Sequence, residues 1–225
     1  MPTYYPMMVD IAGRRCLVVG GGRVAERKIE LLLECGADIQ VVSPACTQRI
    51  AELAAERAIR LACRTLQSDD LTRAFLVFAA TDDAQVNRGV GDAVRKAEGL
   101  VNVADAPEAC SFLVPSVVRR GDLTIAISTG GGSPALAKKL RQRLEATIGP
   151  EYEAFLGALR DLRARAQELI PDPEERQALY RRAVDSSLFE HAARGDQAAV
   201  AACIAELLQQ SPRRHGSVGT PSEPR

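Results

Sequence analysis

The sequence predicts an α/β protein: a Rossmann-type parallel sheet, followed by a small antiparallel β segment and a C-terminal helical domain. Three observations support this prediction. Short apolar runs alternate with amphipathic segments across residues 15–104, a pattern typical of a doubly wound parallel sheet. A glycine-rich turn at residues 20–25 joins the first strand to the first helix. From Glu151 onward the pattern is helical.

The strands of the parallel sheet are expected where short apolar runs occur, at residues 15–20, 39–43, 59–63, 75–80 and 100–104. Helices are expected between them, at residues 24–35, 48–56 and 83–98. The first helix has its apolar residues on one face and stops before Gly36, a residue type favoured just past a helix end. Asp82 or Asp83 is expected to cap the third helix.

The pattern changes after residue 113. Residues 116–120 and 123–128 flank Gly121-Asp122, which predicts an antiparallel hairpin. A helix is expected at residues 134–146, with Ser133 as its N-cap. Further helices are expected at residues 152–170, 173–183 and 197–209.

These elements divide the chain into four expected segments. Residues 1–113 form the Rossmann-type domain, and residues 114–148 form a hairpin and a helix. Residues 149–210 form the helical domain. Residues 211–225 are polar and rich in Pro, Ser and Arg, so we expect a disordered tail.

The composition excludes several classes of protein. Lys and Arg number 29 and Asp and Glu number 29, so the formal net charge is zero and nucleic acid is not expected as a partner. No apolar stretch approaches the roughly 18 residues that a membrane span requires. The first ten residues show no signal-peptide pattern, so a cytoplasmic location is expected.

Cysteine and histidine usage limits the chemistry further. The six cysteines form no C-x-x-C pair and have no histidine nearby, which argues against zinc and favours buried thiols in a reducing cytosol. The histidines are His191 and His215, both late in the chain. Acid–base chemistry earlier in the chain must therefore use carboxylates, Lys, Tyr or Cys.

The loop after the first strand fits the dinucleotide motif G-x-G-x-x-G/A through Gly20, Gly22 and Ala25. Gly20 allows the tight turn, Gly22 leaves room for a pyrophosphate, and Ala25 lets the helix approach the sheet. A tight strand–helix turn that binds no ligand would show the same sequence pattern. The acidic residue expected about 20 positions later is absent, and Ser43 stands at the end of the second strand, so NAD is favoured over NADP only slightly.

Asp105 directly follows the strand expected at residues 100–104, and Asn102 lies within that strand. Ligands of open α/β sheets bind beyond the carboxyl ends of the strands, where a carboxylate could act as a base. Aspartate also caps turns such as Asp-Ala-Pro. Position alone does not separate these two interpretations.

A second glycine-rich loop at residues 129–134 joins a strand to a helix. It lacks the Lys-Ser/Thr ending of a loop that binds nucleoside triphosphates, so ATP and GTP are not expected as ligands. Its N–H groups would suit a carboxylate, and basic residues lie on either side of it. A solvated basic helix face explains those residues equally well.

Several segments together resemble one known family, the precorrin-2 dehydrogenases, which are also the dehydrogenase/ferrochelatase module of siroheme synthase. The matching segments are residues 20–28 (GGGRVAERK), 36–37 (GA), 41–44 (VVSP), 80–82 (ATD), 101–105 (VNVAD), 112–116 (FLVPS) and 125–137 (IAISTGGGSPALA). They occur in family order over roughly residues 3–148, and the helical remainder is compatible with the family.

The resemblance implies NAD-dependent oxidation of precorrin-2 to sirohydrochlorin, with insertion of ferrous iron to give siroheme in many members. It also implies an intertwined homodimer, in which residues 114–148 serve dimerisation and substrate binding and the helical domain contributes to the interface. The family's catalytic aspartate matches Asp105. No fixed metal site is expected, so iron would be a substrate met transiently at Asp105. The expected cofactor contacts are Gly20, Gly22, Arg23, Val24, Ser43, Pro44 and Thr81, and the expected substrate contacts are Asn102, Ser128, Thr129, Gly131 and Ser133.

Two alternatives remain open at the level of sequence. The first is a dehydrogenase without chelatase activity, which the sequence does not separate from a bifunctional enzyme. The second is an NAD-sensing regulatory module, which would leave Asp105 and the loop at residues 128–134 unexplained.

Overall fold

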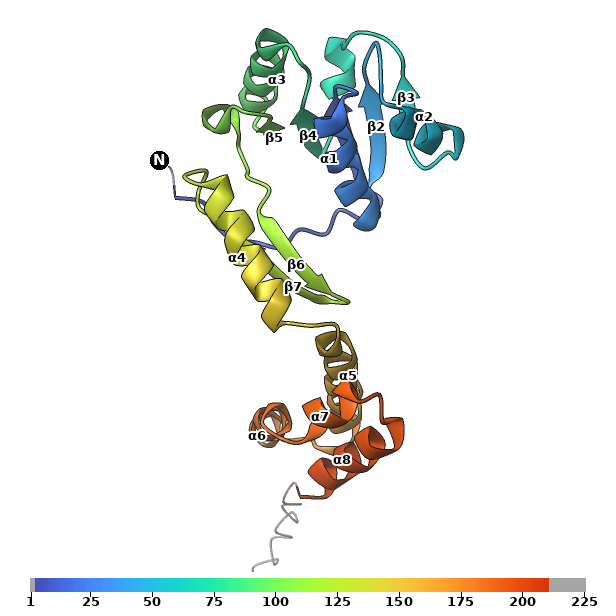
Figure 1. The fold of residues 1–225 in the computed structure, drawn as a ribbon, viewed down its shortest axis with the longest axis vertical. Helices are drawn as coiled ribbons and strands as arrows, with labels where there is room; N and C mark the ends of the chain where they lie inside the picture. Colours follow the sequence, from blue (N-terminus) through green and yellow to red (C-terminus); the bar gives the residue numbers. More distant parts are fainter. Residues whose placement is uncertain (1–2, 211–225) are drawn as a thin grey trace, which may run out of the picture. The chain divides into compact units, whose positions relative to one another are not determined.

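The computed structural model describes residues 3–210, and their contacts group into two compact units (Figure 1). One unit combines the chain up to Pro115 with the segment Ser128–Ala137. The other combines Ser116–Ile127 with the chain from Lys138 onward. The tail predicted at residues 211–225 lies outside the described residues.

The first unit contains the predicted parallel sheet, with the strand order β3-β2-β1-β4-β5. Its strands are β1 (Arg15–Val19), β2 (Asp38–Val42), β3 (Arg60–Ala62), β4 (Leu76–Ala79) and β5 (Leu100–Val103), and every pairing is parallel. Its helices are α1 (Arg23–Glu34), α2 (Gln48–Ala55), α3 (Ala84–Lys96) and the 3-10 turns η1 (Ser68–Leu71) and η2 (Pro107–Ala109). The predicted α/β fold class is confirmed.

Alternation along the strands makes the unit three layers deep (Figure 1). Val18 packs with Ile29 of α1 and Ile50 of α2 on one face of the sheet. Leu17 packs with Val90 of α3 on the other face. Successive side chains of a strand point to opposite faces, so the apolar residues 16–19 of β1 supply both cores.

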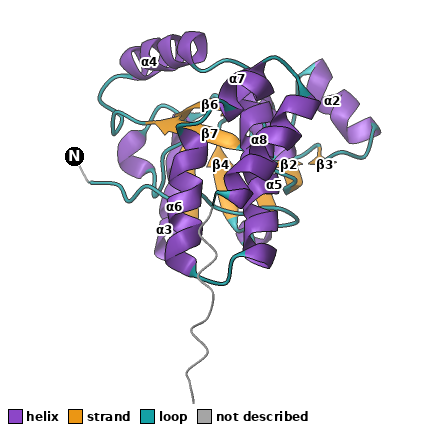
Figure 2. Ribbon diagram, turned by 90° about the horizontal axis from the view of Figure 1, so that it is seen from below, coloured by secondary structure: helices purple, strands orange, loops and turns teal. Residues whose placement is uncertain are grey.

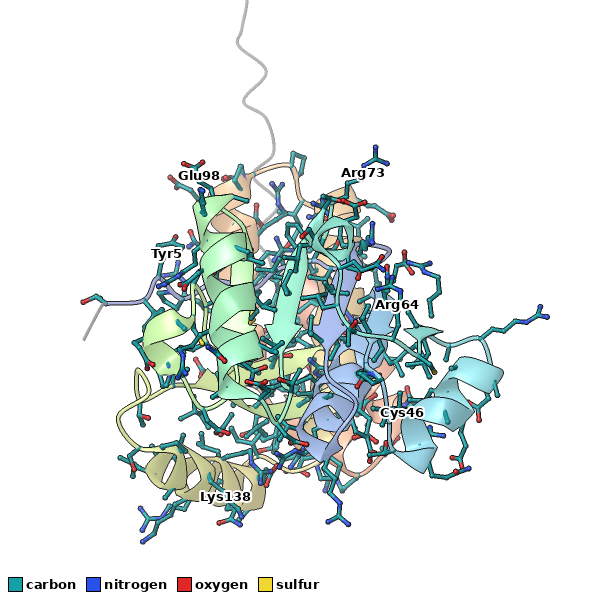
Figure 3. The ribbon with its side chains drawn as sticks, turned by 90° about the horizontal axis from the view of Figure 1, so that it is seen from above. Tyr5, Cys46, Arg64, Arg73, Glu98 and Lys138 are labelled. Carbon is teal, nitrogen blue, oxygen red and sulfur yellow. The ribbon has the colours of Figure 1, made fainter. Side chains whose placement is uncertain are left out.

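Local signals fixed the helix ends. Asp83, one of the two candidate caps, accepts hydrogen bonds from the N–H groups of Gln85 and Val86 and begins α3. Gly36 follows α1 with φ +69°, a conformation that glycine adopts without steric cost. Arg73 and Glu98 adopt positive φ at exposed turns before β4 and β5, and both side chains lie at the periphery of the unit (Figure 3).

The second unit holds the predicted hairpin and a bundle of helices (Figure 2). Strands β6 (Ser116–Arg120) and β7 (Leu123–Ile127) pair antiparallel around Gly121, whose φ is +54°. The helices are α5 (Glu151–Leu169), α6 (Pro173–Val184), α7 (Leu188–Ala193) and α8 (Gln197–Gln209), and α4 (Pro134–Thr147) spans both units.

Helix α7 had no separate prediction, because six residues are too few to display a helical period. Its first residue, Leu188, is fully buried with Leu162, Leu179 and Ile204. This helix therefore owes its place to tertiary packing in the bundle core.

The prediction that most cysteines are buried is wrong, although all six are free thiols. Cys16 is buried within β1, Cys63 is exposed, and the other four are half-buried. The reason is position at element ends: Cys35 is the C-cap of α1, and Cys63 follows the edge strand β3.

None of the helices in residues 3–210 combines the length and the hydropathy that crossing a bilayer requires.

The ion pair between Asp70 and Arg64 should contribute to stability in a way that depends on pH. Asp70 is 6% exposed, and Arg64 (labelled in Figure 3) donates to both of its carboxylate oxygens at 2.7 and 2.8 Å. The hydrogen bonds from Arg64 lower the pKa of Asp70 from 3.8 to about 2. The stabilisation is therefore complete above pH 3.8 and is lost as the pH falls through about 2.

We expect Asp70→Asn to lower the melting temperature at neutral pH by a few degrees. The difference from wild type should shrink as the pH falls from about 4 to about 2. Thermal unfolding followed by circular dichroism across that range measures it. A difference that stays constant over the whole range would contradict the assignment.

Candidate functional site

A cavity of about 510 Å³ lies at the carboxyl ends of β1, β4 and β5, the edge at which open α/β sheets bind ligands. It is lined by Gly22, Arg23 and Val24 after β1, by Ala80, Thr81 and Asp82 after β4, by residues 103–106 and Glu108 after β5, and by Ala84, Asn87 and Arg88 of α3. The structure thus brings together the first glycine loop, Thr81 and Asp105, which the sequence placed at separate strand ends.

The glycines of the β1–α1 loop have different reasons to be glycine. Gly20 has φ +118°, and a Cβ there would stand 2.2 Å from the carbonyl oxygen of Ala80. The fold itself therefore requires glycine at that position. Gly22 has an ordinary φ of −81°, and a Cβ there would meet nothing within 4 Å. The fold therefore does not require glycine at position 22. A ligand that approaches the backbone closely would require it.

The start of α1 is also open to a ligand. Gly22 is its N-cap residue, and no side chain caps it. The first hydrogen bond onto Gly22 comes from the N–H group of Glu26, at 3.0 Å. The N–H groups of the residues before Glu26 and the positive end of the helix dipole suit a phosphate. The residues present therefore fit a dinucleotide pyrophosphate.

Ser43 and Pro44 lie outside the lining of this cavity. Ser43 is 7% exposed, and its hydroxyl donates to the carbonyl of Ala45 at 2.7 Å. The serine hydroxyl is thus engaged within its own loop, which leaves it only acceptor capacity for a ribose. Its role in cofactor binding stays a prediction.

Asn87 is a cavity residue that sequence reasoning missed. It is 6% exposed and occupies the buried stripe of α3 together with Val90 and Val94. An amide at a core position of an amphipathic helix was the available signal, because a buried amide needs partners. The side chain forms hydrogen bonds with Thr81, the residue that follows Ala80 at the end of β4.

Asp105 has φ +58°, an uncommon conformation for a residue other than glycine. Its carboxylate lines the cavity and forms no hydrogen bond or ion pair with other residues among 3–210. The turn-capping interpretation requires such a bond, so the geometry favours an aspartate available to a ligand.

Cys110 lies inside the turn that presents Asp105. Its sulfur accepts from the N–H group of Val103 at 3.1 Å and lies 3.3 and 3.4 Å from the carbonyl oxygens of Val103 and Ala106. Burial raises the pKa of the Cys110 thiol. The sulfur therefore stays protonated near neutral pH.

The side chain of Asn102 forms a hydrogen bond within the protein. The residue is 9% exposed, and its amide donates to the carbonyl of Phe112 at 3.1 Å. This bond ties β5 to the segment that follows η2. Contact between Asn102 and a substrate stays a prediction.

The second glycine loop lies beside the Asp105 turn. A Cβ on Gly131, whose φ is +88°, would lie 3.7 Å from Pro107 at the start of η2. Within the loop, Ser128 accepts from the N–H group of Gly130 at 3.1 Å, and Thr129 accepts from that of Ser133 at 3.0 Å. Within the described part of the chain neither hydroxyl donates its proton, so both can donate to an anion.

Ser133 begins α4 as predicted, because its hydroxyl accepts from the N–H group of Leu136 at 3.2 Å. Some of the neighbouring basic residues have structural partners. Arg120 donates to the carbonyls of Glu145 and Ile148 at the end of α4, and Arg141 pairs with Glu145 at 2.5 Å. Lys138, labelled in Figure 3, is exposed.

Within the part of the chain that the structure describes, no group of three or more His, Cys, Asp or Glu side chains is arranged to hold a metal ion.

Three family models match consecutive parts of this chain. Residues 7–116 match a putative NAD(P)-binding family, which covers the sheet and the cavity. Residues 120–147 match the central region of sirohaem biosynthesis proteins. Residues 151–208 match the dimerisation region of sirohaem synthase. The open glycine loop at the start of α1 is therefore part of an NAD(P)-binding domain.

Curated relatives include the siroheme synthases of Methylococcus capsulatus, 38% identical over 85% of this chain and 40% of the relative, and of Nitrosospira multiformis, 38% identical over 93% of this chain and 45% of the relative. The chain spans less than half the length of these relatives. Among solved structures, SirC, a precorrin-2 dehydrogenase, matches with a TM-score of 0.76 and 29% identity, over 92% of this chain and all of that chain.

Proposed function

This chain belongs to the siroheme synthase family, with that family's NAD(P)-binding, central and dimerisation regions in order, and we propose that it oxidises precorrin-2 to sirohydrochlorin with NAD. The observation that supports this function is the position of Asp105. Its carboxylate, which has no hydrogen-bond or ion-pair partner among residues 3–210, lines the same cavity as the open Gly22 loop. A proton acceptor and a pyrophosphate-binding loop thus face one space.

The oxidation removes two electrons and two protons from the macrocycle. When bound, NAD accepts a hydride, which carries both electrons and one proton. Asp105, the residue that matches the family's catalytic aspartate, is the proposed acceptor of the second proton. The Cys110 thiol of the same turn stays protonated. The carboxylate then returns this proton to water, so the products are sirohydrochlorin, NADH and one proton.

The loop at residues 128–133 is proposed to hold carboxylates of the tetrapyrrole. Ser128 and Thr129 use their oxygens as acceptors inside the loop, so each can donate its hydroxyl proton to a carboxylate. Gly131 places this loop against Pro107, two residues after Asp105. Substrate binding and proton transfer would therefore use adjacent segments.

We further propose that the protein is a homodimer through residues 151–208, on the strength of the matched dimerisation region. We also propose that the protein inserts ferrous iron into sirohydrochlorin. Insertion releases pyrrole N–H protons, which need an acceptor, and Asp105 would serve both reactions. Iron would act as a substrate and not as a resident metal.

A coupled assay tests the function. Precorrin-2 and NAD are supplied first, and NADH is followed by absorbance. Fe²⁺ or Co²⁺ is added afterwards, and the tetrapyrrole spectrum is followed. A steady NADH signal supports the dehydrogenase. The absence of NADH formation despite measurable NAD binding would favour the sensing module, and NADH without metal insertion would favour a dehydrogenase alone.

Ser128→Asp tests the substrate side of the site. Ser128 is exposed, so aspartate is tolerated there, and its charge should repel a polycarboxylate. We expect the KM for precorrin-2 to rise more than the KM for NAD, as measured by steady-state kinetics. Ser128→Ala is the uncharged control and should have the smaller effect. Equal changes in both KM values would argue that Ser128 does not face the tetrapyrrole.

A further inference from the structure

We propose that Asn87 is a positioning residue for the dinucleotide, because it fixes Thr81 so that this residue offers the cofactor hydrogen-bond acceptors only. This inference rests on the dinucleotide part of the proposed function and not on the identity of the second substrate. Both residues line the cavity at the carboxyl edge of the sheet.

The contacts between the two residues are reciprocal. The N–H group and the hydroxyl of Thr81 donate to Oδ1 of Asn87 at 3.0 and 2.7 Å. The Nδ2 group of Asn87 donates back to the carbonyl of Thr81 at 2.9 Å. One side chain thereby holds both the backbone and the hydroxyl of Thr81.

These contacts determine what Thr81 can offer to a ligand. Its N–H proton is engaged, and its hydroxyl proton goes to Asn87, which is nearer than the alternative acceptor, the Asp83 carbonyl at 3.0 Å. The hydroxyl also accepts from the N–H group of Asp83 at 3.2 Å. What remains is one lone pair on the hydroxyl and one on the carbonyl. Thr81 therefore favours ligand donors, which on a dinucleotide are the ribose hydroxyls, the adenine amino group and the carboxamide N–H groups.

Stabilising α3 does not account for Asn87. Asp83 already caps that helix by accepting from the N–H groups of Gln85 and Val86. The position of Asn87 in the buried stripe would suit an apolar side chain, and burying an amide there is favourable only if its partners are satisfied. The partners are all on Thr81, so the amide serves the cavity wall.

Asn87→Ala tests the inference through NAD affinity, measured by isothermal titration calorimetry well below the melting temperature. We expect the Kd for NAD to rise roughly tenfold, the factor that corresponds to one misplaced hydrogen bond. In the coupled assay, the KM for NAD should rise while kcat at saturating NAD stays near wild type. Gln85→Ala removes an exposed amide from the same helix and should leave the Kd unchanged.

Thr81→Val approaches the same contact from the half-exposed partner, so it keeps the test valid if Asn87→Ala fails to fold. It removes the hydroxyl and should also raise the Kd for NAD. A folded Asn87→Ala or Thr81→Val protein that binds NAD like wild type would overturn the inference and leave the proposed function standing. A wild-type protein that binds NAD without oxidising precorrin-2 would contradict the proposed function alone.

Discussion

Asp105→Asn should lower the rate of NAD reduction by precorrin-2 roughly 10²–10⁴-fold, the range typical of a lost general base. Asparagine has nearly the same size and tolerates positive φ, so the φ of +58° at this position is kept. The melting temperature and the Kd for NAD should therefore barely change. Initial rates of NADH formation, calorimetry and thermal unfolding measure these quantities.

Asp82→Asn is the matched control, because Asp82 is an exposed carboxylate that lines the same cavity. It should retain a rate near that of wild type. If one carboxylate serves both reactions, Asp105→Asn should also reduce any metal insertion. An Asp105→Asn protein that reduces NAD at the wild-type rate would contradict the role of Asp105 as the general base. The base would then have to be another group that lines the cavity.

Gly22→Asp should abolish measurable NAD binding while the fold stays intact. The φ of −81° at Gly22 suits any residue, and a Cβ there meets nothing within 4 Å. The new carboxylate would stand at the start of α1, where the pyrophosphate is expected, and would repel it. Calorimetric titration with NAD, together with circular dichroism, measures both parts of this result.

Gly89→Asp adds the same charge to an exposed glycine of α3 that is also open, with nothing within 4 Å of an added Cβ. It should leave NAD affinity unchanged. Gly20 does not offer a clean test, since any side chain there would collide with the Ala80 carbonyl. Unchanged NAD affinity in Gly22→Asp would mean that the loop is only a tight turn.

The sequence by itself determined the order of the strands and of the longer helices, and it indicated the edge of the sheet at which a ligand is expected. The apolar run of β1, the stop at Gly36 and the turn at Gly121 all act within a few residues, so their patterns are readable along the chain. Strand ends in a parallel sheet share one edge. That rule indicated this edge for Asp105, whereas Thr81 was expected at the site only through the family resemblance.

Only the tertiary structure decided what each side chain at that edge does. It engaged the hydroxyl of Ser43 with Ala45 and turned Asn87 onto Thr81. It also left the carboxylate of Asp105 without a partner among the described residues and placed Gly131 beside Pro107. A hydrogen-bond partner is set by distances of about 3 Å and by direction. Those distances follow from how strands and loops that are far apart in the sequence pack together, and no local pattern of residues encodes them.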